Sequence, residues 1–199
     1  MTGIDVSHHN GQINWQQVAA GNAISFVFMK ATQGQTYADP MLSTNAAGAS
    51  KAGLRLGYYH FATLNSANVV ADAQAEAAFF LSTIKPLPTP GLPLILDIEA
   101  NNNNLPAASV LTWINTFFSG LVAAGNHDYA LYSYTPFLNA NLPANHRLGS
   151  IPLWIAAYVN KPAPVLPKGW TNYWIWQYAN NGTVPGITGP VDMNKTTQL

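Results

Sequence analysis

The sequence predicts the α/β fold class, with a parallel sheet closed into a barrel. Over residues 3–134, short apolar runs alternate with segments of helical periodicity or high Ala content. After residue 134 the apolar runs continue, but Pro-rich or Gly-rich loops join them. Parallel strands joined by right-handed helical crossovers close naturally into a barrel. We therefore expect a modified TIM-like barrel, with about five strand–helix units followed by three strands with few helices.

The first five units follow in order along the chain. Each predicted strand is a short, mostly apolar run bounded by turn-forming or polar residues. The strands are expected at residues 3–7, 25–31, 54–62, 92–100 and 129–134. The helices are expected at residues 13–20, with a cap near Asn14, and at 41–52, 68–84 and 106–124.

The remainder of the chain completes eight strands. One short helix is expected within residues 136–142, and strands at 152–159, 173–179 and 191–194. At 199 residues the chain is shorter than the roughly 250 residues typical of a full barrel. We expect one trimmed domain over residues 1–199.

The composition excludes several classes of function. Charged residues make up 8% of the chain and the net charge is zero, so the basic surface needed for nucleic acid is missing. The chain has no cysteine, which excludes a disulfide scaffold and a Cys-based zinc site. No apolar stretch is long enough for membrane insertion, and the N-terminus lacks the pattern of a signal peptide.

Two acids end the most apolar predicted strand. Asp97 and Glu99 are two residues apart, so both side chains lie on the face of Ile95. The whole chain contains eight acids. A pair of carboxylates in an apolar strand resists ionisation, which indicates a functional site.

Two further acids are expected beside this pair. Asp5 lies near the end of the first strand and Asp192 lies in the last, and these strands become neighbours when a barrel closes. In such barrels the working face lies at the carboxyl ends of the strands. Paired carboxylates in a cleft are what hydrolysis of a glycosidic bond requires.

Aromatic residues near the strand ends are candidates for sugar binding. Flat rings with a polar edge suit the apolar face and the hydroxyl rim of a pyranose, although many aromatic residues in a barrel simply fill the core. The candidates are Tyr58, Tyr59, Tyr132, Trp154, Trp176 and Tyr178.

The chain resembles glycoside hydrolase family 25 over essentially its whole length. These enzymes are the Chalaropsis-type muramidases (lysozymes) of bacteria, fungi and phage lysins. The motifs that carry the resemblance occur in the expected order: GIDVS at 3–7, FVFMKAT at 26–32, GYYHFA at 57–62, LDIE at 96–99, LWIAAY at 153–158, WQY at 176–178 and VDMN at 191–194.

The resemblance implies the modified barrel described above and a function. The substrate would be bacterial peptidoglycan, cleaved with retention at the β-1,4 bond between N-acetylmuramic acid and N-acetylglucosamine. Glu99 would be the general acid and later the base. Asp97 would be the nucleophile, or would orient the substrate's 2-acetamido group. Asp5 and Asp192 would position that group, and Tyr59 would support an oxazolinium-like intermediate.

Two other functions stay open at this point. One is hydrolysis of chitin or another N-acetylglucosamine polymer, and the other is a non-catalytic wall-binding module, against which the intact Asp97 and Glu99 argue. A metal site at His8, His9 and His60 with Asp5 is disfavoured, because adjacent histidines do not share one face. We expect no metal and no cofactor. We also expect a monomer without a separate wall-binding module that acts on the wall outside the cytoplasm, either secreted or released as a phage lysin.

Overall fold

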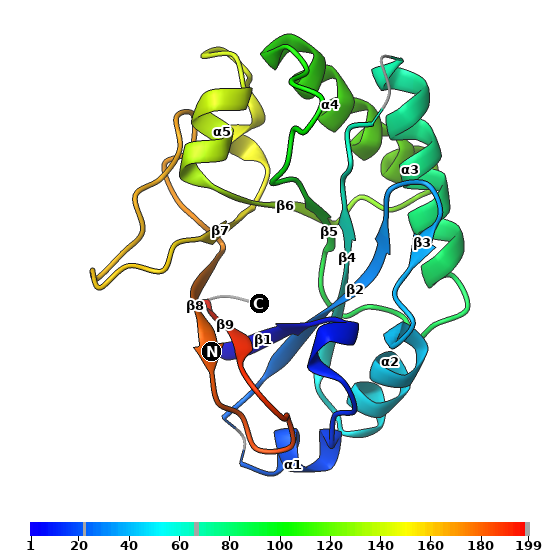
Figure 1. Ribbon diagram of the computed structural model, residues 1–199, viewed down its shortest axis with the longest axis vertical. Helices are drawn as coiled ribbons and strands as arrows, with labels where there is room; N and C mark the ends of the chain where they lie inside the picture. Colours follow the sequence, from blue (N-terminus) through cyan, green and yellow to red (C-terminus); the bar gives the residue numbers. More distant parts are fainter. Residues whose placement is uncertain (22, 66–67, 198–199) are drawn as a thin grey trace.

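The protein forms a closed barrel surrounded on part of its circumference by helices (Figure 1). The computed structural model describes residues 1–21, 23–65 and 68–197, so the last two residues of the predicted domain lie outside the described residues. The predicted fold class is confirmed.

Nine strands and five α-helices occur within the described ranges. The strands are β1 (Thr2–Val6), β2 (Phe26–Gln33), β3 (Tyr37–Ala38), β4 (Arg55–Phe61), β5 (Leu94–Asp97), β6 (Tyr129–Tyr134), β7 (Leu153–Ala156), β8 (Ile175–Gly182) and β9 (Val191–Lys195). The α-helices are α1 (Trp15–Ala20), α2 (Leu42–Lys51), α3 (Val69–Ile84), α4 (Ala107–Ala123) and α5 (Thr135–Asn141), and two short 3-10 helices are η1 (His8–Asn10) and η2 (Leu148–Ser150).

Eight of the strands close the barrel in the order β1-β9-β8-β7-β6-β5-β4-β2, with β2 pairing back to β1. The strands β1, β2, β4, β5, β6, β7 and β8 are parallel to one another around the barrel, whereas β9 is antiparallel to both of its neighbours, β8 and β1. The two-residue strand β3 pairs with the end of β2 in a region predicted as loop. A strand of that length has too little periodicity to be predicted from sequence.

Local sequence explains where the helices begin. The side chain of Asn14 accepts a hydrogen bond from the backbone N–H of Gln17 and caps α1. Asn68 caps α3 in the same way through the N–H of Ala71. Helices follow the strands as far as α5, but the connections from β7 to β8 and from β8 to β9 contain no helix in the described residues.

The apolar core has two parts, one outside and one inside the barrel. The larger part lies between the sheet and the helices and contains Trp113 and Phe117 of α4. The smaller part fills the barrel interior with Phe28, Ile95 and Trp154. This interior packing makes the barrel solid below its mouth, as in other barrels of this class.

Three acids outside the barrel mouth form structural contacts. Glu76 of α3 lies 2.7 Å from His60 Nε2, and both side chains are fully buried. Asp72 accepts a hydrogen bond from Trp113 Nε1, and Asp39 contacts His8 Nδ1. His60 thus faces the helix layer, away from His8 and His9. In the described residues no group of three His, Cys, Asp or Glu side chains is arranged to hold a metal ion.

Candidate active site

The barrel mouth contains a cavity of about 280 Å³ lined by four carboxylates. They are Asp5 from β1, Asp97 at the end of β5, Glu99 just after it, and Asp192 from β9. The structure therefore brings together the four acids that the sequence predicted to converge. Half of the eight acids in this chain lie in this one cavity.

The strands place this cavity directly above the interior core. On each of several strands, one residue packs in the barrel interior and the residue two positions further along lines the cavity, because alternate side chains share a face. The pairs are Phe28 and Lys30 on β2, Ile95 and Asp97 on β5, Ala130 and Tyr132 on β6, and Ile175 and Gln177 on β8.

Asp97 and Glu99 differ in their environments. Asp97 is 6% exposed, and its Oδ1 atom has no hydrogen-bond partner in the part of the chain that the structure describes. Burial, and next the Glu99 carboxylate, raise the pKa of Asp97 well above its usual value. Burial also raises the pKa of Glu99, although the Lys30 ammonium opposes this shift. Glu99 is half-buried and in contact with the cavity.

Asp5 and Asp192 lie directly opposite one another on the antiparallel strands β1 and β9, so their carboxyl groups influence each other's ionisation. Burial, and next the charge of Asp192, raise the pKa of Asp5 to about 7. Burial likewise raises the pKa of Asp192. Two adjacent carboxylates cannot both ionise cheaply, so the pair holds a proton over much of the range below neutral pH.

Two amide side chains hold Asp5 in place. Gln177 Nε2 and Asn194 Nδ2 donate to the same oxygen, Asp5 Oδ2, at 2.8 and 2.7 Å. Trp154 Nε1 donates to Asn194 Oδ1, and an indole N–H is only ever a donor. This contact fixes the orientation of the Asn194 amide. The hydroxyls of Tyr132 and Tyr158 donate to Gln177 Oε1 and fix the other amide in the same way.

Lys30 is the cation in this cavity lining. Its ammonium group donates to Gln33 Oε1 at 2.7 Å and lies 4.7 Å from the centre of the Phe61 ring. Burial lowers the pKa of Lys30, and the nearby carboxylates, Asp97 foremost, counteract that shift. Lys30 therefore offsets part of the negative charge that the four acids concentrate here.

The structure separates the predicted sugar-binding aromatics into two groups. Tyr59, Tyr132, Trp154 and Tyr158 line the cavity; of these, Tyr158 was not among the six sequence candidates. The other three candidates lie elsewhere. Tyr58 is buried in the outer core, where its hydroxyl donates a hydrogen bond to the backbone oxygen of Pro88. The indole N–H of Trp176 donates to the backbone oxygen of Ala157. The rings of Trp176 and Tyr178 both lie beside the Lys195 ammonium group.

Sequence reasoning did not select Gln177, Asn194 or Lys30 as site residues. Gln177 lies inside the WQY motif and Asn194 inside the VDMN motif. Strand periodicity was the signal that could have identified both. Gln177 shares its strand face with the interior residue Ile175, whereas Trp176 lies on the opposite face. Asn194 similarly shares a face with Asp192.

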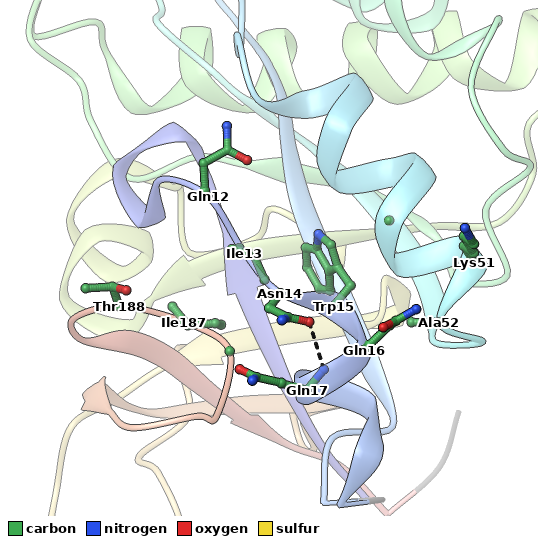
Figure 2. A pocket seen from close by; sticks show the side chains of 12 residues that line it. Gln12, Ile13, Asn14, Trp15, Gln16, Gln17, Lys51, Ala52, Ile187 and Thr188 are labelled. Atoms are coloured by element: carbon green, nitrogen blue, oxygen red, sulfur yellow. Dashed lines mark hydrogen bonds between the residues drawn. The ribbon is translucent and has the colours of Figure 1, made fainter.

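A larger cavity, of about 650 Å³, lies away from the acids (Figure 2). It is formed by the start of α1, the end of α2 and residues 186–188, and Figure 2 shows several amide side chains and Lys51 around it. Its lining contains no carboxylate. The volume of a cavity does not by itself identify the active site. Acid–base chemistry needs titratable groups, and these line the smaller cavity.

The raised pKa of Asp5 predicts a pH-dependent stability cost. Folded Asp5 keeps its proton up to a pH of about 7, whereas an unfolded aspartic acid loses it near 3.8. Folding therefore takes up a proton between these values, so the free energy of unfolding falls as pH rises through this range. We expect Asp5→Asn to raise the free energy of unfolding at pH 7 by roughly 2–4 kcal/mol. Urea denaturation at several pH values measures this gain.

The gain should become small near pH 4 and vanish below it, because Asp5 of the unfolded parent chain also becomes protonated near 3.8. Asp128→Asn is the matched control, because Asp128 is an exposed acid outside the cavity. A gain that is equal at pH 4 and pH 7, or shared by the control, would show that proton uptake by Asp5 is not its cause.

The described residues contain no helix that is both long and apolar enough to span a membrane.

Comparison with known proteins identifies the family. The model of "Glycosyl hydrolases family 25" matches residues 4–187. "Lysozyme M1" of Streptomyces globisporus is 35% identical over 199 residues, which cover 97% of this chain and 66% of the relative. The "N,O-diacetylmuramidase" of Chalaropsis sp is 30% identical, with 96% of this chain and 95% of the relative covered. The chain spans 56% of the "Autolytic lysozyme" of Clostridium acetobutylicum, so some relatives are considerably longer.

Solved structures agree with this assignment. The bacterial lysozyme from Streptomyces coelicolor superposes with a TM-score of 0.87 at 33% identity, covering 99% of this chain and 92% of that chain. The muramidase from Acremonium alcalophilum gives a TM-score of 0.83 at 27% identity. Sequence motifs, barrel topology and the carboxylate cavity lead to one conclusion: the chain belongs to the glycosyl hydrolases of family 25.

Proposed function

We propose that this protein hydrolyses bacterial peptidoglycan at the β-1,4 bond between N-acetylmuramic acid and N-acetylglucosamine, with retention of configuration. The observation that carries the proposal is the group of four carboxylates in one cavity at the barrel mouth. Glycosidic cleavage needs a carboxylic acid to protonate the leaving oxygen and a second group to stabilise or attack the sugar carbon. The barrel is the catalytic domain in this proposal, and the wall outside the cytoplasm is where it acts.

Glu99 is the proposed general acid. Its pKa is raised, mainly by burial, so the protonated form persists to a higher pH than for an exposed glutamic acid. It is also half-buried rather than enclosed, so a glycosidic oxygen can approach it. After the leaving group departs, the same carboxylate accepts a proton from the attacking water.

Asp97 is proposed to orient the 2-acetamido group of the sugar. Its Oδ1 is buried and finds no hydrogen-bond partner among the described residues, which is costly unless a substrate N–H supplies the missing hydrogen bond. That bond would favour the ionised form of Asp97 and offset the effect of burial on its pKa. The acetamido oxygen is then held for attack on the anomeric carbon, with the carboxylate stabilising the positive charge that develops.

Asp5 and Asp192 are proposed to shape the same subsite. The amides of Gln177 and Asn194 hold Asp5 in place, so the Asp5–Asp192 pair would form a polar wall of the cavity that Glu99 also lines. Tyr59 lines the cavity near this wall and is proposed to contact the cyclic intermediate. Tyr132 and Trp154 are proposed as the surfaces against which the sugar ring packs.

Analysis of the new reducing ends in digested wall tests the proposed bond specificity. The digest is reduced with borohydride and the muropeptides are identified by mass spectrometry. We expect reduced N-acetylmuramic acid at the new ends. Reduced N-acetylglucosamine at those ends would instead identify a glucosaminidase, and cleavage of chitin oligomers at a comparable rate would favour a broader polymer hydrolase.

A further inference from the structure

An apolar pocket adjoins the carboxylate cavity on the side of Glu99. It has a volume of about 530 Å³ and shares Glu99, Tyr132 and Tyr158 with the cavity. The rest of its lining comes from the ends of β6 and β7, from the start of α5 and from the connection between β7 and β8, which extends away from the barrel (Figure 1). The remaining lining is mostly aliphatic and includes Pro136, Ala157, Val159 and Val165.

The polar atoms near this pocket already have partners. The Tyr158 hydroxyl donates to Gln177 Oε1, and the Tyr134 hydroxyl donates to the backbone oxygen of Glu99. The Thr135 hydroxyl donates to the backbone oxygen of Val165. The two tyrosines therefore present ring carbons, and the pocket offers few free hydrogen-bonding groups other than the Glu99 carboxylate.

The pocket is unusual in being apolar and exposed. Tyr158 is 51% exposed, Val159 43% and Val165 65%, and all three lie within one short stretch of the chain. Solvent-exposed apolar clusters beside a catalytic group commonly mark a ligand contact. At the opposite end, past Asp5 and Asp192, the cleft continues into a pocket lined by polar residues such as Ser7 and Asn180. The cleft is thus polar at one end and apolar at the other.

A sugar ring is a poor occupant for the apolar end. Each hydroxyl placed there would lose water without gaining a partner, at a cost of about 1–3 kcal/mol each. If the proposed function holds, the substrate also carries apolar groups: the lactyl methyl of muramic acid and the alanine methyls of the stem peptide. The stem peptide bears carboxylates as well, and the β7–β8 connection contains Lys161 and Lys168 but no acid.

We propose that this apolar pocket beside Glu99 is a subsite for the stem peptide of peptidoglycan, and that it makes the enzyme favour peptide-bearing glycan. The inference rests on the proposed function, because it assigns a role to one part of that substrate. In this proposal, the side chains of Val159 and Val165 contact the methyl groups of the peptide.

The test compares two forms of one wall preparation, one intact and one stripped of its stem peptides by an amidase. The variant carries Val159→Asn and Val165→Asn together, which makes the pocket polar without placing a new charge beside Glu99. We expect kcat/KM on intact wall to fall about 10-fold, and on stripped glycan by less than about twofold. Val70→Asn on α3 is the control, because Val70 is 43% exposed, as is Val159, and lies outside the pocket. It should change neither rate.

The outcomes separate the inference from the proposed function. A parent protein that prefers intact wall, with the preference lost in the double variant, supports the subsite. A parent that cleaves both forms equally, or a variant that slows on both alike, overturns the subsite and leaves the proposed function standing. A parent that cleaves neither form overturns the proposed function and the subsite with it. Thermal unfolding of the double variant checks that the barrel is intact.

Discussion

Glu99→Gln should lower the rate of wall hydrolysis by roughly 10²–10⁴-fold, the range expected for loss of a general acid. The amide is nearly isosteric with the protonated carboxyl group, but it cannot transfer a proton to the glycosidic oxygen. The fold should be unaffected, because burial already disfavours the charged form of this side chain. Clearing of a wall suspension measures the rate, and sedimentation with insoluble wall measures binding, which should persist.

The control for this variant is Asp128→Asn, which removes one negative charge at an exposed site outside the cavity. It should retain the parent rate. If Glu99→Gln cleared wall at the parent rate, another group would be the proton donor and the proposed mechanism would be wrong. If it failed to bind wall, its low rate would reflect lost binding, and the role of the acid would need a single-turnover measurement.

Asp97→Asn should lower the rate on the order of 10²–10³-fold, the cost of removing one preorganised electrostatic contact with the transition state. The neutral amide retains the shape of Asp97 but stabilises less positive charge at the anomeric carbon. The loss should be in kcat more than in KM, because the interaction strengthens as charge develops. Initial rates over a range of soluble glycan concentrations separate the two constants.

Azide distinguishes the two possible roles of Asp97. If the carboxylate attacked the sugar directly, Asp97→Ala would leave space for azide to attack instead, restoring turnover and producing a glycosyl azide. If Asp97 orients the acetamido group, azide should not restore the rate. De-N-acetylated wall should then also be a poor substrate for the parent protein. Rescue by azide would therefore refute the proposed orienting role.

Strand periodicity agrees with the lining of the cavity where it was followed, and the preference for aromatic residues departs from that lining where it was followed instead. Asp97 and Glu99 lie two residues apart, and the alternation of side chains was enough to place both toward the barrel mouth. The same alternation argues against Trp176, whose neighbour Gln177 faces the cavity. The preference for aromatic residues as sugar platforms selected Trp176 and Tyr178, whereas the structure places Gln177 and Tyr158 in the lining.

Asp192 illustrates what strand direction adds. It is the second residue of β9, so in a parallel strand it would lie at the end of the barrel opposite the mouth. Because β9 runs antiparallel to β1 and β8, the beginning of this strand lies beside the ends of the others, and Asp192 faces Asp5. The short connection over residues 183–190 permits this reversal, since a parallel strand would need a longer crossover.

The sequence by itself determined the succession of strands and helices, the face on which each acid lies and the family motifs. These depend on local periodicity and on residue types that are adjacent in the chain. Only the tertiary structure decided which carboxyl groups share a proton, how far burial raises their pKa values, and that an apolar pocket adjoins Glu99. Those properties depend on distances and solvent exclusion between segments far apart in the chain, which are set by how the barrel closes and how its last strand returns.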